Sequence, residues 1–506
     1  MNRITGVTHL RLKYPGEQKL LFWDFSLSVR SGEKLLLLGP SGSGKSTLLQ
    51  VLSGLVPQAV ELPMKADEVT VPESWGFVFQ DPDTQFCMPF VDEEMAFVLE
   101  NMGNPREQML PLMQLYLKRV GLELNDLHTD IQTLSQGMKQ RLAIASVLAL
   151  APDVLFLDEP TAMLDPEGTE QVWDTLKAAA MDKTVVIVEH KIEHVSGFID
   201  RVVVLNESGE IVADGQPEHV FAEQRELLRE YGIWYPGVWE EHVASVGPLR
   251  KQAGEAIGEA ANRQDAVLAT DPIATIRELR GWYGKAVKLE LAAADIAPGE
   301  WICVIGRNGA GKSTLLLSLM KLIRTSGDYR VYGREATATS QLSRDIAFVF
   351  QNPEWQFVTE SVAEEAAYSL RVEGLLAEMD IRERTDALLR EFELVGLETR
   401  HPYQLSLGQK RRLSVAASIV RGQQLVLLDE PTFGQDARNT FAMLAKLERL
   451  REAGATIVTV THDMKIVEHY ATRVWEVLDG RVHVRDRLVA DPAVAFASES
   501  AKGDSR

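Results

Sequence analysis

The sequence predicts an α/β protein of two domains in tandem, each with a mainly parallel sheet flanked by helices. An apolar run, a glycine-rich stretch and a helix-like segment follow one another in each half of the chain. Strand-like and helix-like segments then alternate through both halves. Landmark residues recur at a nearly constant separation, because Gly306 follows Gly39 by 267 residues and Asp429 follows Asp158 by 271. The chain is therefore predicted to be one domain written twice.

Both glycine-rich stretches match the pattern of a phosphate-binding loop, G-x-x-x-x-G-K-[ST]. Each lies between an apolar run, 35–38 or 301–305, and a helix-like segment. Glycines let successive N–H groups converge on one point, and the helix N-terminus adds partial positive charge. The lysine would reach the β- and γ-phosphates of ATP, and the next serine would bind Mg²⁺. The predicted ATP-binding residues are Gly39, Pro40, Ser41, Gly42, Ser43, Gly44, Lys45, Ser46 and Thr47, and Gly306, Arg307, Asn308, Gly309, Ala310, Gly311, Lys312, Ser313 and Thr314.

Two adjacent acidic residues close a buried strand in each half, within the sequence Asp-Glu-Pro-Thr. Carboxylates at the C-terminal ends of strands lie where open α/β sheets bind ligands. Asp158 and Asp429 suit Mg²⁺, directly or through water. Glu159 and Glu430 suit a base that polarises the attacking water. The alternative is an acidic turn that caps a helix, and the phosphate loop upstream argues against it.

Composition limits the classes of protein that fit. The chain of 506 residues has a net charge of −20, from 53 basic and 73 acidic residues, and it has no run of Lys or Arg of the kind that nucleic-acid binders carry. The longest apolar stretch, 143–151, is shorter than the roughly 18 residues that a membrane span needs. The first five residues have no signal-peptide core, and two cysteines predict no disulfide framework. We expect a cytosolic protein without a nucleic-acid partner.

Domain boundaries follow from shifts in composition. The stretch 243–271 is rich in Ala, Gly and Glu and has no sustained period, which predicts a linker with some helix. The domains on either side are then 1–242 and 272–490. The last residues, 491–506, form a polar tail that is predicted to be disordered.

A serine-led helix precedes each acidic pair, with the sequence LSQGMKQR at 134–141 and LSLGQKRR at 405–412. Serine is an ordinary helix cap, although serine and glycine at a helix start also make a phosphate-facing surface. The order of phosphate loop, this motif and the Asp-Glu pair resembles the nucleotide-binding domain of ATP-binding cassette (ABC) proteins, twice over. The resemblance implies an N-terminal antiparallel β-region and a helical subdomain beside each core sheet.

The resemblance also implies two composite ATP sites, because paired cassettes of this family close head to tail. One site would join the loop 39–47 to Ser406 and Gly408, and the other would join the loop 306–314 to Ser135 and Gly137. His190 and His462 match the histidine that senses the γ-phosphate, and Gln80 and Gln351 match the glutamine that reaches Mg²⁺ beside Ser46, Asp158, Ser313 and Asp429. Tyr14 and Tyr283 match the aromatic that stacks on adenine, or else are core residues. Asp165 and Asp436 match the aspartate that couples the sites.

Some residues depart from the family pattern. Gln136 and Leu407 stand where the signature motif usually has a second glycine, and Met138 replaces a glutamine. The loop before Asp436 also differs from the usual sequence. Because both phosphate loops and both catalytic glutamates are present, we expect two hydrolytic sites. The site that uses Ser135 and Gly137 is expected to be the weaker one.

A further motif, F-Q-[DN]-P-x-x-Q-F, occurs at 79–86 and 350–357 and precedes an acidic helix each time. It resembles the ATPases of energy-coupling factor (ECF) importers. There it forms a groove for arginine-bearing helices of a transmembrane coupling subunit, a role that Asp83 and Glu354 fit. An exposed acidic helix with no partner is the plainer alternative.

By this resemblance the chain is the ATPase of a prokaryotic importer for a vitamin, a vitamin precursor such as hydroxymethylpyrimidine/thiamine, or a metal ion. Its partners would be the coupling subunit and a membrane-embedded substrate-binding component, which would hold it at the cytoplasmic face of the membrane. A tandem ATPase of a sugar importer and a soluble tandem-cassette translation factor are the alternatives. The short linker with few basic residues argues against the translation factor, and the Gln-Phe pair argues against the sugar importer.

Overall fold

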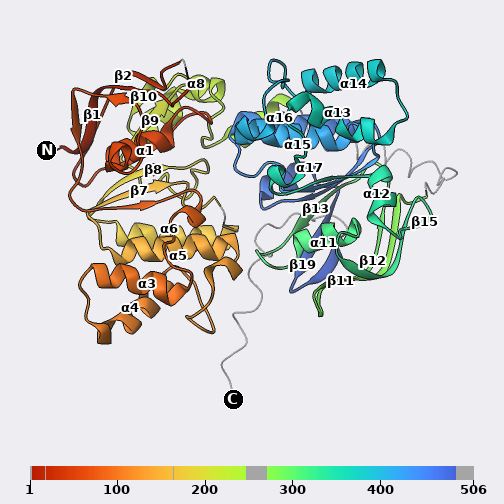
Figure 1. Cartoon of the computed structure of the whole chain (residues 1–506), viewed down its shortest axis with the longest axis horizontal. Helices are drawn as coiled ribbons and strands as arrows, with labels where there is room; N and C mark the ends of the chain where they lie inside the picture. The colour runs from red at the N-terminus through yellow and green to blue at the C-terminus, as the bar shows by residue number, and fades with distance from the viewer. Residues whose placement is uncertain (1–2, 18, 163, 247–270, 486–506) are drawn as a thin grey trace. The chain divides into compact units, whose positions relative to one another are not determined.

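A computed structural model describes residues 3–485, apart from 18, 163 and 247–270. It has two compact units. The first contains Met1–Glu240 with Ser406–Gly408 and Gly434–Ala442, and the second contains the remainder. Each unit is a layered α/β structure built on one phosphate loop (Figure 1). Most of the predicted linker and the whole predicted tail lie outside the described residues.

The first cassette has two sheets. Its N-terminal sheet is antiparallel, as the resemblance implied, with the order β2-β1-β4 and β5 paired to β1. The core sheet has the order β10-β9-β3-β8-β7-β6 and is parallel except for the antiparallel β9–β10 ribbon. The strands are β1 (Arg3–Leu12), β2 (Phe22–Arg30), β3 (Lys34–Leu38), β4 (Met64–Lys65), β5 (Glu68–Thr70), β6 (Trp75–Val78), β7 (Val154–Asp158), β8 (Thr184–Val188), β9 (Arg201–Leu205) and β10 (Ile211–Gly215).

Helices of the first cassette cover the sheet and form the helical subdomain. After the β9–β10 ribbon come two short helices, α7 and α8, which meet at Gln224. The helices are α1 (Lys45–Ser53), α2 (Leu55–Gln58), α3 (Val91–Asn101), α4 (Arg106–Arg119), α5 (Gln136–Ala149), α6 (Pro166–Ala179), α7 (Pro217–Glu223), α8 (Arg225–Glu230) and α9 (Val238–Val246), with 3₁₀ turns η1 (Pro82–Thr84) and η2 (Ile131–Thr133).

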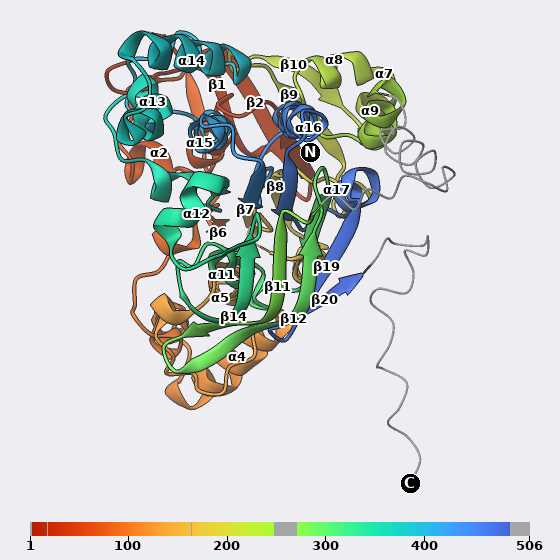
Figure 2. The same cartoon turned by 90° about the vertical axis from the view of Figure 1, so that its right-hand side faces the viewer.

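The second cassette has one continuous sheet of ten strands instead of two sheets. The order is β15-β14-β11-β12-β20-β19-β13-β18-β17-β16, and the pairing of β12 with β20 joins its antiparallel and parallel parts (Figure 2). The strands are β11 (Ala274–Tyr283), β12 (Ala286–Ile296), β13 (Trp301–Ile305), β14 (Arg324–Val331), β15 (Arg334–Glu335), β16 (Ile346–Val349), β17 (Leu425–Asp429), β18 (Thr456–Val460), β19 (Arg473–Leu478) and β20 (Arg481–Arg485).

Its helices repeat those of the first cassette only in part, because α2 and α7–α9 have no counterpart among the described residues of the second cassette. They are α11 (Lys312–Leu319), α12 (Thr339–Asp345), α13 (Val362–Glu373), α14 (Glu378–Glu391), α15 (Leu407–Ile419), α16 (Ala437–Glu452) and α17 (Met464–Tyr470), with η3 (Pro353–Gln356) and η4 (Pro402–Gln404). No helix of the described part of the chain is long and apolar enough to cross a membrane.

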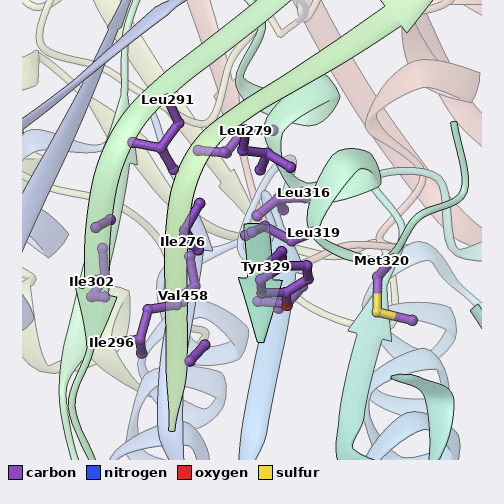
Figure 3. Packing of buried hydrophobic residues seen from close by; sticks show 14 of the residues in the cluster. Ile276, Leu279, Leu291, Ile296, Ile302, Leu316, Leu319, Met320, Tyr329 and Val458 are labelled. Carbon is purple, nitrogen blue, oxygen red and sulfur yellow. The ribbon is translucent and has the colours of Figure 1, made fainter. Parts of the chain in front are cut away.

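The core holds each phosphate loop in place. Strands such as β7 and β17 are buried along their whole length, as expected for parallel strands covered on both faces. In the second cassette, Ile276 and Leu279 of β11 face Leu316 and Leu319 of α11, the helix that begins in the phosphate loop (Figure 3). Burying each such side chain contributes roughly 1.5–3 kcal/mol. The antiparallel strands therefore fix the helix that orients the loop.

Candidate active sites

Each phosphate loop lies between a buried strand and a helix, as predicted. Gly44 and Gly311 precede α1 and α11 with φ of +92° and +112°, a conformation that favours glycine. Lys45 and Lys312 are almost fully buried. The Lys45 ammonium donates to the carbonyls of Gly39 (2.8 Å) and Pro40 (2.9 Å), and Lys312 donates to the corresponding carbonyls. Hydrogen bonds thus hold each lysine ammonium against the backbone of its own phosphate loop.

The predicted magnesium ligands lie beside these loops. The Ser46 hydroxyl donates to Asp158 Oδ1 over 3.0 Å, and a side-chain hydrogen bond also joins Ser313 to Asp429. Burial raises the pKa of Asp158 and of Asp429 to about 6, against the opposing effect of the serine hydroxyls. The carboxylates are therefore costly to ionise without a cation nearby.

A magnesium ion fits this set of donors. Asp429 Oδ1 is buried and has no hydrogen-bond partner among the described residues. Hydroxyl, carboxylate and amide oxygens are the hard ligands that Mg²⁺ prefers. Gln80 is half-buried after β6, whereas Gln351 is exposed after β16. The structure thus brings a serine and an aspartate together in each cassette. Gln80 and Gln351 lie just after β6 and β16, the strands next to those that end in the aspartates.

The two candidate catalytic glutamates have unusual backbone geometry. Glu159 and Glu430 are buried, with φ of +48° and +51°, although neither is glycine. Such a conformation costs about 1–3 kcal/mol and is often found at functional sites. Each backbone N–H donates to the neighbouring strand, from Glu159 to Val188 O and from Glu430 to Val460 O. Both carboxylates are thereby aimed from the end of a buried strand.

The two histidines that are predicted to sense the γ-phosphate lie against these carboxylates. His190 Nε2 is 3.0 Å from Glu159 Oε1, and His462 Nε2 is 3.1 Å from Glu430 Oε1. Gln80 also donates to Glu159, over 2.8 Å. Burial raises the pKa of Glu159, but His190, Lys45 and Gln80 outweigh it, and the net effect lowers that pKa. An ionised Glu159 can accept a proton or orient water.

The candidate adenine-stacking tyrosines are not core residues, because Tyr14 is 44% exposed and Tyr283 is 51% exposed. The Tyr14 hydroxyl lies 2.5 Å from the Thr47 hydroxyl at the end of its phosphate loop. Stacking stays a prediction for both rings. An exposed ring beside the loop is nevertheless available to a base, which a buried ring is not.

The signature motifs open α5 and α15, as the capping pattern predicted. Ser135 is the N-cap of α5 and accepts from the Met138 N–H over 3.3 Å. Ser135 and Ser406 are both exposed. The pairing of Ser406 and Gly408 with the first loop, and of Ser135 and Gly137 with the second, stays a prediction. Asp165 and Asp436 cap the helices that follow them, accepting from Gly168 N and Asn439 N.

The sequence did not predict the lysine partners of Asp83 and Glu354 or the burial of Glu94. Asp83 forms an ion pair with Lys139 of α5 (2.6 Å), and Glu354 forms one with Lys410 of α15 (2.5 Å), so neither carboxylate is a simple solvent-exposed charge. Glu94 of the acidic helix is buried and accepts from the Cys87 and Met88 N–H groups. The recurrence of a lysine at the same signature position was the available signal.

The ABC transporter family model matches residues 22–162 and 289–433, which include both phosphate loops and both acidic pairs. The chain belongs to the ABC transporter family. A Bacillus subtilis relative, named "Putative HMP/thiamine import ATP-binding protein YkoD", is 34% identical over 94% of this chain and 89% of the relative. A Methanosarcina acetivorans relative named as an ABC transporter ATP-binding protein is also 34% identical, over 95% of this chain and 84% of the relative.

This ABC protein therefore binds ATP and is an ATPase with two cassettes. The archaeal ribosome recycling factor aABCE1, solved in complex with a ribosomal stalk protein, has a similar structure. Its TM-score is 0.62 with 20% identity, over 94% of this chain and 89% of that one. At that identity the likeness concerns the fold alone.

Proposed function

We propose that this ABC ATPase is the energy-coupling subunit of an ECF-type importer in a prokaryote. The observation that carries the proposal is the duplicated turn of the F-Q-[DN]-P-x-x-Q-F motif. Both copies fold as a 3₁₀ turn that follows a core strand and precedes a helix with acidic residues in its first turn. The name of the B. subtilis relative, an import ATP-binding protein, supports the same class.

The hydrolytic chemistry follows from the residues around each loop. Loop N–H groups, with Lys45 or Lys312, bind and orient the phosphates of ATP. Mg²⁺, held by Ser46, Asp158 and Gln80 or by the equivalent set, would neutralise charge on the β- and γ-phosphates. The strained glutamate at each strand end accepts the proton of the attacking water, and its histidine neighbour keeps the carboxylate oriented.

The proposed partners are a transmembrane coupling subunit and a membrane-embedded substrate-binding component. Asp83 and Glu354, whose side chains are 32% and 38% exposed, each offer a carboxylate to a cationic helix of the coupling subunit. The chain would then be held at the cytoplasmic face of the cell membrane through these partners. As cargo we propose a vitamin, a vitamin precursor such as hydroxymethylpyrimidine/thiamine, or a metal ion.

The test is to tag the chain, solubilise native membranes in mild detergent, and identify what co-purifies. A polytopic coupling subunit with a small membrane binding protein is the expected result, and the ligand of the binding protein would name the cargo. A variant that combines Asp83→Asn/Lys139→Met with Glu354→Gln/Lys410→Met removes each carboxylate together with the lysine that it pairs with, and should lose both partners while remaining folded. Recovery with ribosomes, or with sugar-specific permease subunits, would overturn the proposal and leave the two-site ATPase.

A further inference from the structure

The turn of the F-Q-[DN]-P-x-x-Q-F motif is fastened to the signature helix of the same cassette. We call residues 81–86 and 352–357 the docking turns, and α5 and α15 the signature helices. In the first cassette, Gln85 donates to Ala143 O (3.0 Å) and accepts from the Phe79 N–H. In the second, Gln356 donates to Ser414 O (2.8 Å) and accepts from the Ser414 hydroxyl. The second glutamine of the motif thus joins turn and helix in both cassettes.

An ion pair completes this connection at the end of the helix that bears the signature residues. Lys139 is the fourth residue of α5, and its side chain is only 6% exposed. Its ammonium lies 2.6 Å from Asp83 Oδ1, while Gln136 donates to the other oxygen over 3.2 Å. Lys410 repeats the pair with Glu354 at 2.5 Å, and its side chain is 15% exposed.

The Asp83 carboxylate stabilises the charge of Lys139, which is otherwise unfavourable at this position. A cation in the first turn of a helix meets the partial positive charge of the N-terminus. Burial adds a desolvation cost, and removing the partner of a buried charge is strongly destabilising. Gln132 Oε1, at 3.4 Å from Lys139, is a distant and uncharged substitute. The position of the first turn of α5, and of Ser135 and Gly137 with it, therefore depends on where Asp83 lies.

We propose that Lys139 and Lys410 are positioning residues of the ATPase reaction. They transmit the state of the docking turn to Ser135 and Gly137, or to Ser406 and Gly408. A cationic group that binds Asp83 shares the carboxylate with Lys139, so that docking shifts the first turn of the signature helix. This step rests on the proposed function for the identity of the docked group and for the role of the signature residues at ATP. Transmission in the reverse direction requires only this chain.

The test measures that reverse transmission by hydrogen–deuterium exchange of the whole purified chain. In a Glu159→Gln/Glu430→Gln background, ATP with Mg²⁺ should slow exchange at 39–47, at 135–139 and at 81–86. Adding Lys139→Met should preserve the protection at 39–47 but reduce that at 81–86 by about tenfold, a typical allosteric coupling. Lys139→Arg should restore it, because the charge returns. Lys118→Met, at an exposed lysine of α4, is the matched control and should change neither segment.

Steady-state kinetics give a second readout in the otherwise unchanged chain. Lys139→Met and Lys410→Met should each lower kcat several-fold at an unchanged folded fraction, which denaturant unfolding of the same samples checks, and Lys139→Arg should restore the rate. If Lys139→Met does not fold, Asp83→Asn/Lys139→Met removes both charges and is expected to fold.

The proposal would be overturned if ATP still protected 81–86 in the Lys139→Met variant or in the Asp83→Asn/Lys139→Met variant. It would also be overturned if ATP did not protect 81–86 in the Glu159→Gln/Glu430→Gln chain. These experiments contain no membrane subunit. A failed co-purification would therefore remove the importer function and the identity of the docked group, and would leave the coupling between the docking turn and the signature helix to be judged by the exchange experiment alone.

Discussion

The two cassettes share the residues that are predicted to carry the reaction and differ in some of the residues around them. Both have a lysine folded over its phosphate loop, a serine–aspartate pair and a glutamate at positive φ. Around this common centre, Gln136 faces Asp83 in the first cassette, whereas Leu407 holds that place in the second. Buried Glu189 precedes the histidine in one, and Thr461 precedes it in the other. The predicted catalytic groups are thus present twice, whereas their surroundings differ between the cassettes.

The largest expected effect comes from separating the two glutamates. Glu159→Gln and Glu430→Gln should each abolish hydrolysis at their own site, because loss of a general base costs about 10²–10⁴-fold. Since the site that uses Ser135 and Gly137 is predicted to be the weaker, Glu159→Gln should remove more of the total turnover. Phosphate release by each single variant and by the double variant checks this. If one substitution leaves turnover unchanged, its site was not hydrolysing in the parent.

The next effect is a dependence on pH above about pH 6 that only the first cassette should have, because the raised pKa values of Asp158 and Asp429, about 6, affect both cassettes only below that pH. Burial, with smaller contributions from Glu159 and Asp158, raises the pKa of Glu189 to about 8, although the Thr161 hydroxyl and Lys191 act to lower it. The folded chain therefore keeps a proton that the unfolded chain releases above its ordinary pKa of 4.5. The free energy of unfolding should fall between about pH 4.5 and 8, by on the order of a few kcal/mol.

Glu189→Thr, which copies the second cassette, should flatten that dependence, and Thr461→Glu should create one there. Denaturant unfolding from pH 5 to 8.5 provides the measurement. The same slope in the parent and in Glu189→Thr would mean that other groups cause it.

A smaller difference is expected between the two glycines that precede the loop helices. At Gly44 a Cβ would lie 2.7 Å from the buried Phe22 ring, whereas at Gly311 its nearest neighbour is 3.4 Å away. Gly44→Ala and Gly311→Ala should each lower the free energy of unfolding by roughly 1–2 kcal/mol, because alanine is strained at positive φ. Gly44→Ala should lower it by about 1–3 kcal/mol more through overpacking against Phe22. Gly44→Ala should therefore lower the stability and the affinity for a fluorescent ATP analogue more than Gly311→Ala. Equal losses would show that Phe22 can yield.

The smallest effect concerns the cap of α6. Asp165 accepts from the Gly168 N–H over 2.8 Å, so Asp165→Ala should cost about 1 kcal/mol of stability. Asp165→Asn retains an acceptor and is the matched control. A loss of turnover by Asp165→Asn without a loss of stability would instead assign the residue a direct role in coupling the sites.

Local sequence was sufficient to predict the strand–loop–helix units, the acidic strand ends and the serine caps, because a few adjacent residues determine each of them. The positive φ of Glu159 was not predictable, since its strand and the turn after it impose it together. The pairing of Lys139 with Asp83 joins residues 56 apart and depends on the tertiary fold. The sequence also suggested two equivalent domains, and nothing in it distinguished two sheets in the first cassette from one in the second.

That difference in sheet continuity has a mechanical meaning. In the second cassette the Glu290 N–H donates to Gly480 O (2.7 Å), and the Gly480 N–H donates to Ala310 O of the phosphate loop (2.9 Å). The antiparallel strands that bear Tyr283 are thus bonded into the same plate as the loop. In the first cassette the strand that leads to Tyr14 belongs to a separate sheet. A displacement of the strand that bears Tyr283 should therefore reach the phosphate loop of the second cassette through backbone hydrogen bonds. In the first cassette, a displacement near Tyr14 would have to cross from one sheet to another.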